Sequence, residues 1–119
     1  MCGIGGIINT NNSKIDPNII ENIKDSLEHR GPDNSSIKYI SESNCFVHTR
    51  LSIIDLNDRS NQPFQSSDGR YTLVFNGEIY NYKEIRKDLE SIGISFNTEG
   101  DTEVLLKGFI AVSYTHLRA

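Results

Sequence analysis

The alternation of apolar and polar positions along the chain predicts several short strands. The first eight residues, in which Ile4, Ile7 and Ile8 stand among glycines, are expected to form a buried strand. Residues 36–40 and 45–49 are predicted to form a hairpin across the polar turn 41–44, and residues 71–75 a further strand. The segment 57–69 is rich in Asn, Asp, Ser, Gln and Pro, a composition typical of a loop.

Three helices are predicted between and after these strands. The first has Asp16 as its N-cap, a proline at the first helical position and apolar residues at helical spacing, and it ends near Arg30. The second starts at Asn81, where an acidic residue three positions later resembles a capping box, and it runs to Gly93. The third starts at Asp101, another expected N-cap. The order of strands and helices predicts an α+β fold.

Composition narrows the class of protein. The chain has 119 residues, so we expect one domain at most, and its net charge of −4 offers no basic surface for nucleic acid. No apolar run approaches the ~20 residues of a membrane span, and a basic signal region is absent, so we expect a cytoplasmic protein without a membrane partner. Two cysteines cannot form a disulfide framework, and the histidines lack metal-ligand spacing, so no metal site is expected.

Cys2 is the first candidate for chemistry. Once Met1 is removed, the thiol and the free α-amine lie on one residue, so a nucleophile and a general base come together. The amine has a reference pKa of ~7.7–8, close to cytoplasmic pH, whereas an unassisted thiol at ~8.5 is mostly protonated there. Gly3, Gly5 and Gly6 leave room for a substrate or a neighbouring strand. The alternative is a glycine-rich strand start without chemistry.

The other candidates lie where predicted strands end or helices begin, positions that can converge on one edge of a sheet. The guanidinium of Arg50 can bind a carboxylate in a bidentate manner, and Asp101 suits an ammonium group. Asn76 and the amide of Gly77 can supply two donors for a developing oxyanion. A ligand with a carboxylate, an ammonium group and a side-chain carbonyl is an amino acid attacked at its side chain, and glutamine fits this description.

Structural interpretations stand beside these functional ones. Asn76-Gly77 is a strong turn signal and could be the tip of a hairpin. The segment 30–33, Arg-Gly-Pro-Asp, could be nothing more than the stop signal of the first helix. Cys45 lies in a predicted strand and is expected to be buried without a chemical role.

These candidates belong to longer motifs that follow one another from residue 1 to about residue 110. The motifs are Met1-Cys2-Gly3-Ile4, Arg30-Gly31-Pro32-Asp33, His48-Thr49-Arg50-Leu51-Ser52-Ile53-Ile54-Asp55, Gln62-Pro63, Asn76-Gly77-Glu78-Ile79-Tyr80-Asn81 and Gly100-Asp101-Thr102-Glu103-Val104. In order and in register, they resemble the N-terminal glutaminase domain of glutamine-hydrolysing asparagine synthetases, which are class II glutamine amidotransferases.

This resemblance implies an N-terminal nucleophile hydrolase fold, with two antiparallel sheets between layers of helices. It implies that Cys2 attacks glutamine, forms a γ-glutamyl thioester and releases ammonia, and that Asn76 and Gly77 form the oxyanion hole. Arg50 would take the α-carboxylate, and Glu78 and Asp101 the amino-group end. The rest of the glutamine pocket would be shaped by backbone, from Leu51, Ser52, Ile53 and Ile54.

The resemblance also implies partners beyond the chain. No cofactor is expected for the glutaminase domain itself. ATP and Mg²⁺ belong to a synthetase domain that is missing from this chain. That domain activates aspartate as β-aspartyl-AMP and accepts the ammonia through an internal tunnel. The intact enzyme could be a homodimer. Homologues that amidate sugars or polymer precursors share the same motifs, so the acceptor stays open.

The resemblance weakens near the end of the chain. Residues 1–110 are expected to be a partial amidotransferase domain, incomplete at its C-terminus, and residues 111–119 do not resemble the family's continuation and look like a non-native tail. The synthetase signature Ser-Gly-Gly-x-Asp-Ser is absent, so the chain is not expected to make asparagine by itself. Two hypotheses follow: a glutaminase fragment, or a non-catalytic module whose missing strands leave an open sheet edge.

Overall fold

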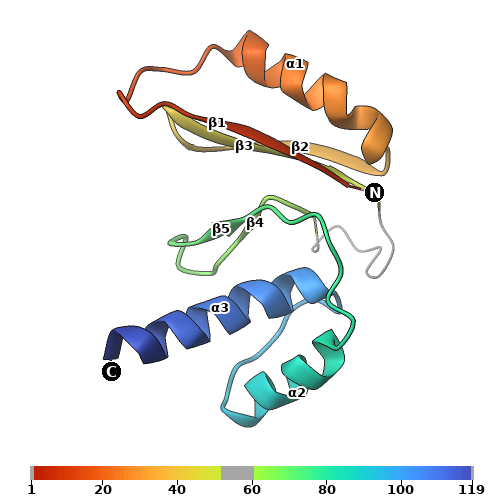
Figure 1. Ribbon diagram of the computed structural model, residues 1–119, viewed down its shortest axis with the longest axis vertical. Helices are drawn as coiled ribbons and strands as arrows, with labels where there is room; N and C mark the ends of the chain where they lie inside the picture. The colour runs from red at the N-terminus through yellow and green to blue at the C-terminus, as the bar shows by residue number, and fades with distance from the viewer. Residues whose placement is uncertain (1, 52–60, 119) are drawn as a thin grey trace.

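The central element of the protein is a three-stranded antiparallel sheet. The computed structural model describes residues 2–51 and 61–118. Strands β1 (Gly3–Ile8), β2 (Asn34–Ser41) and β3 (Asn44–Arg50) lie in the order β1-β3-β2, with β3 in the middle (Figure 1). β2 and β3 are the predicted hairpin, which is confirmed. The first strand is also present, but its predicted burial is wrong, because β1 is an edge strand on which Ile4 and Ile8 are exposed.

Helix α1 (Pro17–Leu27) covers one face of this sheet and closes the main core. The predicted N-cap is confirmed, because the Asp16 carboxylate accepts from the Asn18 N–H at 2.9 Å. Ile20 of the helix is fully buried against Cys45 and Val47 of β3. Cys45 is fully buried, as the sequence predicts, and burial raises the pKa of its thiol. A short 3₁₀ helix, η1 (Glu28–Arg30), ends the unit.

A small ribbon lies on the other face of the sheet, formed by β4 (Phe64–Gln65) and β5 (Thr72–Leu73) in antiparallel pairing (Figure 1). The prediction of a loop through residue 69 is therefore wrong at β4. The polar residues make only the turn, where Asp68 accepts from the Ser66 hydroxyl and the Arg70 N–H, while Phe64 pairs with Leu73. This turn also replaces Asn76-Gly77 as the hairpin tip.

Helices α2 (Tyr82–Ser91) and α3 (Asp101–Arg118) form the outer layer. α2 ends as predicted at Gly93, whose φ of 95° suits glycine, with the Gly93 N–H donating to Glu90 O and the Ile94 N–H to Leu89 O. The capping box predicted at Asn81 is not formed, because the Asn81 side chain makes no capping hydrogen bond. No helix among the described residues is long and apolar enough to cross a membrane.

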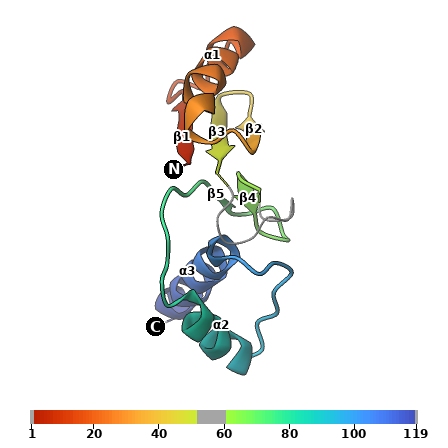
Figure 2. The ribbon, with the colours of Figure 1, turned by 90° about the vertical axis from the view of Figure 1, so that its right-hand side faces the viewer.

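The side view in Figure 2 shows the order of the layers: α1, the three-stranded sheet, the β4–β5 ribbon, and then α3 with α2. The chain is therefore α+β, with antiparallel sheets and three α-helices among the described residues. This is compatible with the N-terminal nucleophile hydrolase fold, whose assignment stays a prediction. α3 continues through residue 118, and the origin of residues 111–119 also stays a prediction.

Candidate functional site

The Cys2 thiol lies against the end of β3, beside the chain that follows Arg50. The Leu51 N–H donates to Cys2 Sγ at 3.4 Å, and the thiol lies 3.8 Å from the Leu51 carbonyl oxygen. The Gly3 N–H donates to Thr49 Oγ1 at 3.1 Å, which fixes the start of β1 on the same strand. Residues separated by 49 positions in the sequence are thus brought together at one sheet end.

Arg30 is a neighbour of Cys2 to which the sequence analysis gave no role in the site, although it named Arg30 in a helix stop and in a motif of the resemblance. Its Nε donates to the Cys2 carbonyl oxygen at 3.2 Å, so the guanidinium holds the backbone of the candidate nucleophile. Gly31 lies directly against the backbone of β3, and the Asp33 N–H donates to the Arg50 carbonyl at 3.0 Å. The signal for this role was available, because Arg30-Gly31-Pro32-Asp33 is one of the motifs of the resemblance.

Arg50 is the last residue of β3 and is buried. Its Nη1 donates to Asn61 Oδ1 at 2.6 Å, so its guanidinium is held at the edge where the chain enters the β4–β5 ribbon. Leu51 is next to it and contacts Cys2. The remaining residues predicted to shape the pocket, Ser52, Ile53 and Ile54, lie outside the described residues.

Asn76, Gly77 and Glu78 form a three-residue exposed arch between β5 and α2. Both ends of this arch are tied to buried side chains. On one side, the Phe75 carbonyl pairs with His48 Nε2 at 3.3 Å and the Phe75 N–H donates to Gln62 Oε1. On the other, the Ile79 N–H donates to Asp101 Oδ2 at 2.9 Å. The exposed residues are therefore held by their neighbours.

His48 is fully buried. Burial lowers the pKa of the His48 ring and the nearby Arg50 charge lowers it further, whereas the Phe75 carbonyl acts in the opposite direction. Because a carbonyl can only accept, Nε2 carries the hydrogen, and Nδ1 is buried without a hydrogen-bond partner among the described residues. His48 thus holds the arch through its contact with the Phe75 carbonyl.

Asp101 begins α3 and is buried, with its carboxylate turned to the arch. The sequence predicted it as the N-cap of α3 and as a ligand for an amino group. The structure gives the carboxylate a tertiary partner, Ile79, which joins Asp101 to the Asn76–Glu78 arch. Within residues 2–51 and 61–118, no three acidic, His or Cys side chains gather to hold a metal ion.

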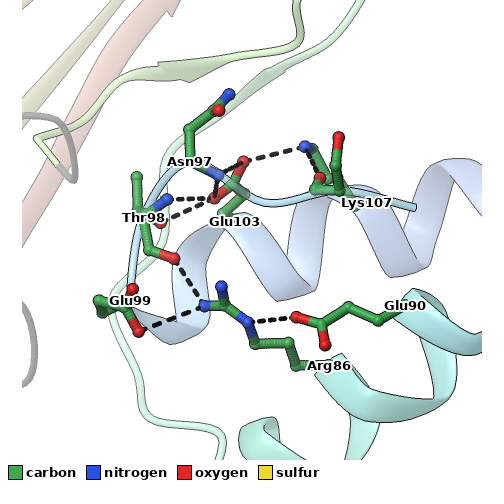
Figure 3. A network of polar contacts seen from close by, with 8 residues as sticks. Arg86, Glu90, Asn97, Thr98, Glu99, Glu103 and Lys107 are labelled. Carbon is green, nitrogen blue, oxygen red and sulfur yellow. Dashed lines mark hydrogen bonds and ion pairs between the residues drawn. The ribbon is translucent and has the colours of Figure 1, made fainter. Parts of the chain in front are cut away.

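The loop that leads into Asp101 is fixed by a polar network that the sequence did not reveal (Figure 3). The buried Glu103 carboxylate accepts from the N–H groups of Asn97 and Thr98, from the Thr98 hydroxyl and from Lys107. Burial by itself would raise the pKa of Glu103, but the Lys107 ammonium and the Thr98 and Asn97 donors together lower it.

Arg86 of α2 braces the same loop from the other side. It donates to the Thr98 carbonyl at 2.6 Å and pairs with Glu90 and Glu99 (Figure 3). Its guanidinium also lies over the ring of Phe96. The loop that precedes Asp101 is therefore held by side chains of both α2 and α3.

These contacts form two groups of candidate residues, which β3 connects. Cys2, Leu51 and Arg50 lie at the end of β3, while the arch and Asp101 are joined through Ile79; His48 of β3 holds the arch by Phe75. In Figure 1 the start of β1, the end of β3, the segment between β5 and α2 and the start of α3 all lie on the right-hand side. The convergence of all these residues on one sheet edge stays a prediction.

The comparisons with known proteins identify the class to which this arrangement belongs. The model of the glutamine amidotransferase domain family matches residues 1–118, and the chain belongs to this family. The chain is similar to three proteins of Bacillus subtilis (strain 168): asparagine synthetase (glutamine-hydrolyzing) 1, at 41% identity over 109 residues, the corresponding enzyme 2, at 38% over 109 residues, and enzyme 3, at 34% over 113 residues.

The alignments cover 89%, 89% and 92% of this chain but only 17%, 14% and 18% of the respective relatives. The chain thus spans less than a fifth of the length of these enzymes. The similarity is confined to one domain of a larger architecture, and the resemblance predicted from the motifs is confirmed at the level of the domain family.

Proposed function

We propose that this domain hydrolyses glutamine, with Cys2 as the nucleophile. The proposal is supported above all by the position of the Cys2 thiol against Leu51, next to the buried Arg50, in a member of the glutamine amidotransferase family. A thiol is suited to attack on a side-chain carbonyl, and Arg50, which directly precedes Leu51 in the chain, has a guanidinium suited to bind a carboxylate.

The proposed reaction begins when the Cys2 thiol gives its proton to the α-amine that removal of Met1 exposes. The sulfur then forms a bond to the side-chain carbonyl carbon of glutamine, and the carbonyl oxygen becomes an oxyanion. The C–N bond breaks as the amine returns the proton to the leaving nitrogen, which departs as ammonia. Water hydrolyses the γ-glutamyl thioester, giving glutamate and the free thiol.

The arch and the strand ends would bind the glutamine substrate. Asn76 and the Gly77 N–H would donate to the oxyanion, which is stabilised most when its donors are held in place before the reaction. Arg50 would bind the α-carboxylate, with Leu51, Ser52, Ile53 and Ile54 shaping the pocket. Glu78 and Asp101 would bind the α-ammonium group. The domain itself needs no cofactor for these steps.

In the longer enzyme, we propose that the ammonia passes to a synthetase domain that uses ATP and Mg²⁺ to amidate aspartate. This extension is supported by the relatives named asparagine synthetase (glutamine-hydrolyzing), which this chain matches over one domain. We place the enzyme in the cytoplasm and propose a homodimer for the intact form. A different acceptor would leave the glutaminase step unchanged.

The test is covalent labelling by an electrophilic glutamine analogue, read by mass spectrometry. We expect one label on Cys2 and none on Cys45, because Cys45 is fully buried. Cys2→Ala should abolish both labelling and glutamine-dependent ammonia release, while Cys45→Ala, the matched control, should retain both. Labelling that survives Cys2→Ala would mean that another group is the nucleophile.

The role of the α-amine has its own test. The same spectra should show that active enzyme begins at Cys2, since in the uncleaved chain the amine is locked in a peptide bond. Activity in enzyme that retains Met1 would contradict the proposed base.

A further inference from the structure

Gln62 lies at the meeting point of three elements, and the proposed mechanism does not use it. It is buried, with 6% of its surface exposed, in the segment that leads into β4. Its backbone carbonyl accepts from the Ser36 hydroxyl of β2. Its side-chain Oε1 accepts from the Phe75 N–H, and its Nε2 donates to Thr102 Oγ1 of α3 at 3.4 Å.

The two partners of the Gln62 amide each adjoin a candidate site residue. Phe75 immediately precedes Asn76-Gly77, and Thr102 immediately follows Asp101. One planar amide group therefore joins the residue before the arch, with its proposed oxyanion donors, to the start of α3, with Asp101 as the proposed ligand of the amino group. The contact with the arch is reinforced, because His48 holds the carbonyl of the same Phe75.

The chemistry of the amide suits this task. It presents an acceptor and a donor on one rigid plane, so it can serve an N–H on one side and a hydroxyl oxygen on the other. A methionine of similar size fills the space but offers no donor. Because the amide is buried, each of its polar atoms must find a partner inside the protein, which restricts its orientation.

We propose that Gln62 is a positioning residue, which sets the placement of the Asn76–Glu78 arch relative to Asp101 through its contacts with Phe75 and Thr102. The proposal rests on the proposed function, since it concerns the alignment of the glutamine site. Displacing reacting groups by about 1 Å can cost about a hundredfold in rate, so a fixed link between these segments has a direct effect on turnover.

The test separates the two sides of the amide by steady-state kinetics of glutamine hydrolysis in the intact enzyme. Gln62→Met removes both contacts, and we expect a fall in kcat of about 10- to 100-fold together with a rise in KM. Thr102→Val removes only the contact toward Asp101, so KM should rise about three- to tenfold with kcat nearly retained. Thr102→Ser keeps the hydroxyl and should restore the wild-type KM.

Two further variants make the result specific. Gln65→Met is the matched control, because Gln65 is an exposed glutamine of β4 only three residues away, and it should have wild-type kcat and KM. In the Gln62→Met background, Thr102→Val should add no further rise in KM, since the contact is already lost. A purely structural role would lower the active fraction in every variant and leave KM unchanged.

A second readout does not depend on activity. The Phe75 N–H should be protected from hydrogen exchange in the wild type, in Gln65→Met and in Thr102→Val, and should exchange at least about tenfold faster in Gln62→Met. Equal protection in Gln62→Met, or kinetics within twofold of Gln65→Met, would overturn the proposal. Failure of the wild type and of Gln65→Met to hydrolyse glutamine would instead refute the proposed function, whatever the exchange data show.

Discussion

Gly31 is the position where adding a single methyl group should most disturb the packing between η1, β2 and β3. A Cβ built at Gly31 would lie 2.4 Å from the Arg50 N atom and the Thr49 carbonyl carbon, and 2.5 Å from the Thr49 carbonyl oxygen. These are backbone atoms of the central strand, so no side-chain rotation relieves the contact. Gly31→Ala must push the two segments apart by about 1 Å to reach ordinary contact distance.

The expected cost follows from what this movement disturbs. Overpacking of a tight site costs about 1–3 kcal/mol. The same movement strains the hydrogen bond from the Asp33 N–H to the Arg50 carbonyl, now 3.0 Å, and the Pro32–Arg50 bridge beside it, which adds about 1 kcal/mol. We therefore expect Gly31→Ala to lower the free energy of unfolding by about 2–4 kcal/mol, a large part of the stability of a small domain.

Gly108→Ala is the matched control and should have the opposite sign. Gly108 lies inside α3, and a Cβ there would only touch Leu89 Cδ1 at 3.9 Å, an ordinary van der Waals contact. Replacing glycine in a helix interior by alanine stabilises by about 0.5–1 kcal/mol. Urea unfolding followed by far-UV circular dichroism should separate the two variants by about 2.5–5 kcal/mol. Gly31→Ala with wild-type stability would refute the close packing on which the argument depends.

The remaining predictions concern the arch, the buried histidine and the Glu103 network. Asn76→Asp should unfold at nearly the wild-type temperature but hydrolyse glutamine at least about a hundredfold more slowly, because it puts a negative charge where a donor is needed; near-normal turnover would leave Asn76 with only a structural role. Burial lowers the pKa of His48 in the folded state, so below the unfolded pKa of about 6.5 the unfolded chain binds the proton more readily and the free energy of unfolding falls. Between pH 6.5 and 5, the free energy of unfolding should therefore fall more steeply in wild type than in His48→Gln. Equal slopes would contradict this. Glu103→Gln should lower the free energy of unfolding at pH 7 by about 1–3 kcal/mol through loss of the Lys107 ion pair and carboxylate hydrogen bonds. Although burial acts to raise it, the donors lower the folded pKa of Glu103, so this difference from wild type should shrink as the pH falls through that pKa, and a difference that persists in strong acid would argue against an ionic role.

The local sequence determined much of the secondary structure. The N-cap at Asp16, the hairpin of β2 and β3 and the glycine stop at Gly93 were predicted because each depends on residues within a few positions of one another. The same reasoning failed at β4, where a strand of two residues carries too short a pattern to be recognised. It also failed at Asn81, where the side chain does not form the cap that its spacing allows.

The candidate site residues could be named from the sequence, because their chemistry and motifs are local properties. Which of them meet was decided by the tertiary structure. The contacts of Cys2 with Leu51 and Arg30, and of Asp101 with Ile79, join residues between 22 and 49 positions apart. Gln62 likewise reaches Phe75 and Thr102 only in the folded chain. Such pairs leave no periodic signal, because a buried polar atom takes whichever partner the packed layers bring within hydrogen-bond distance.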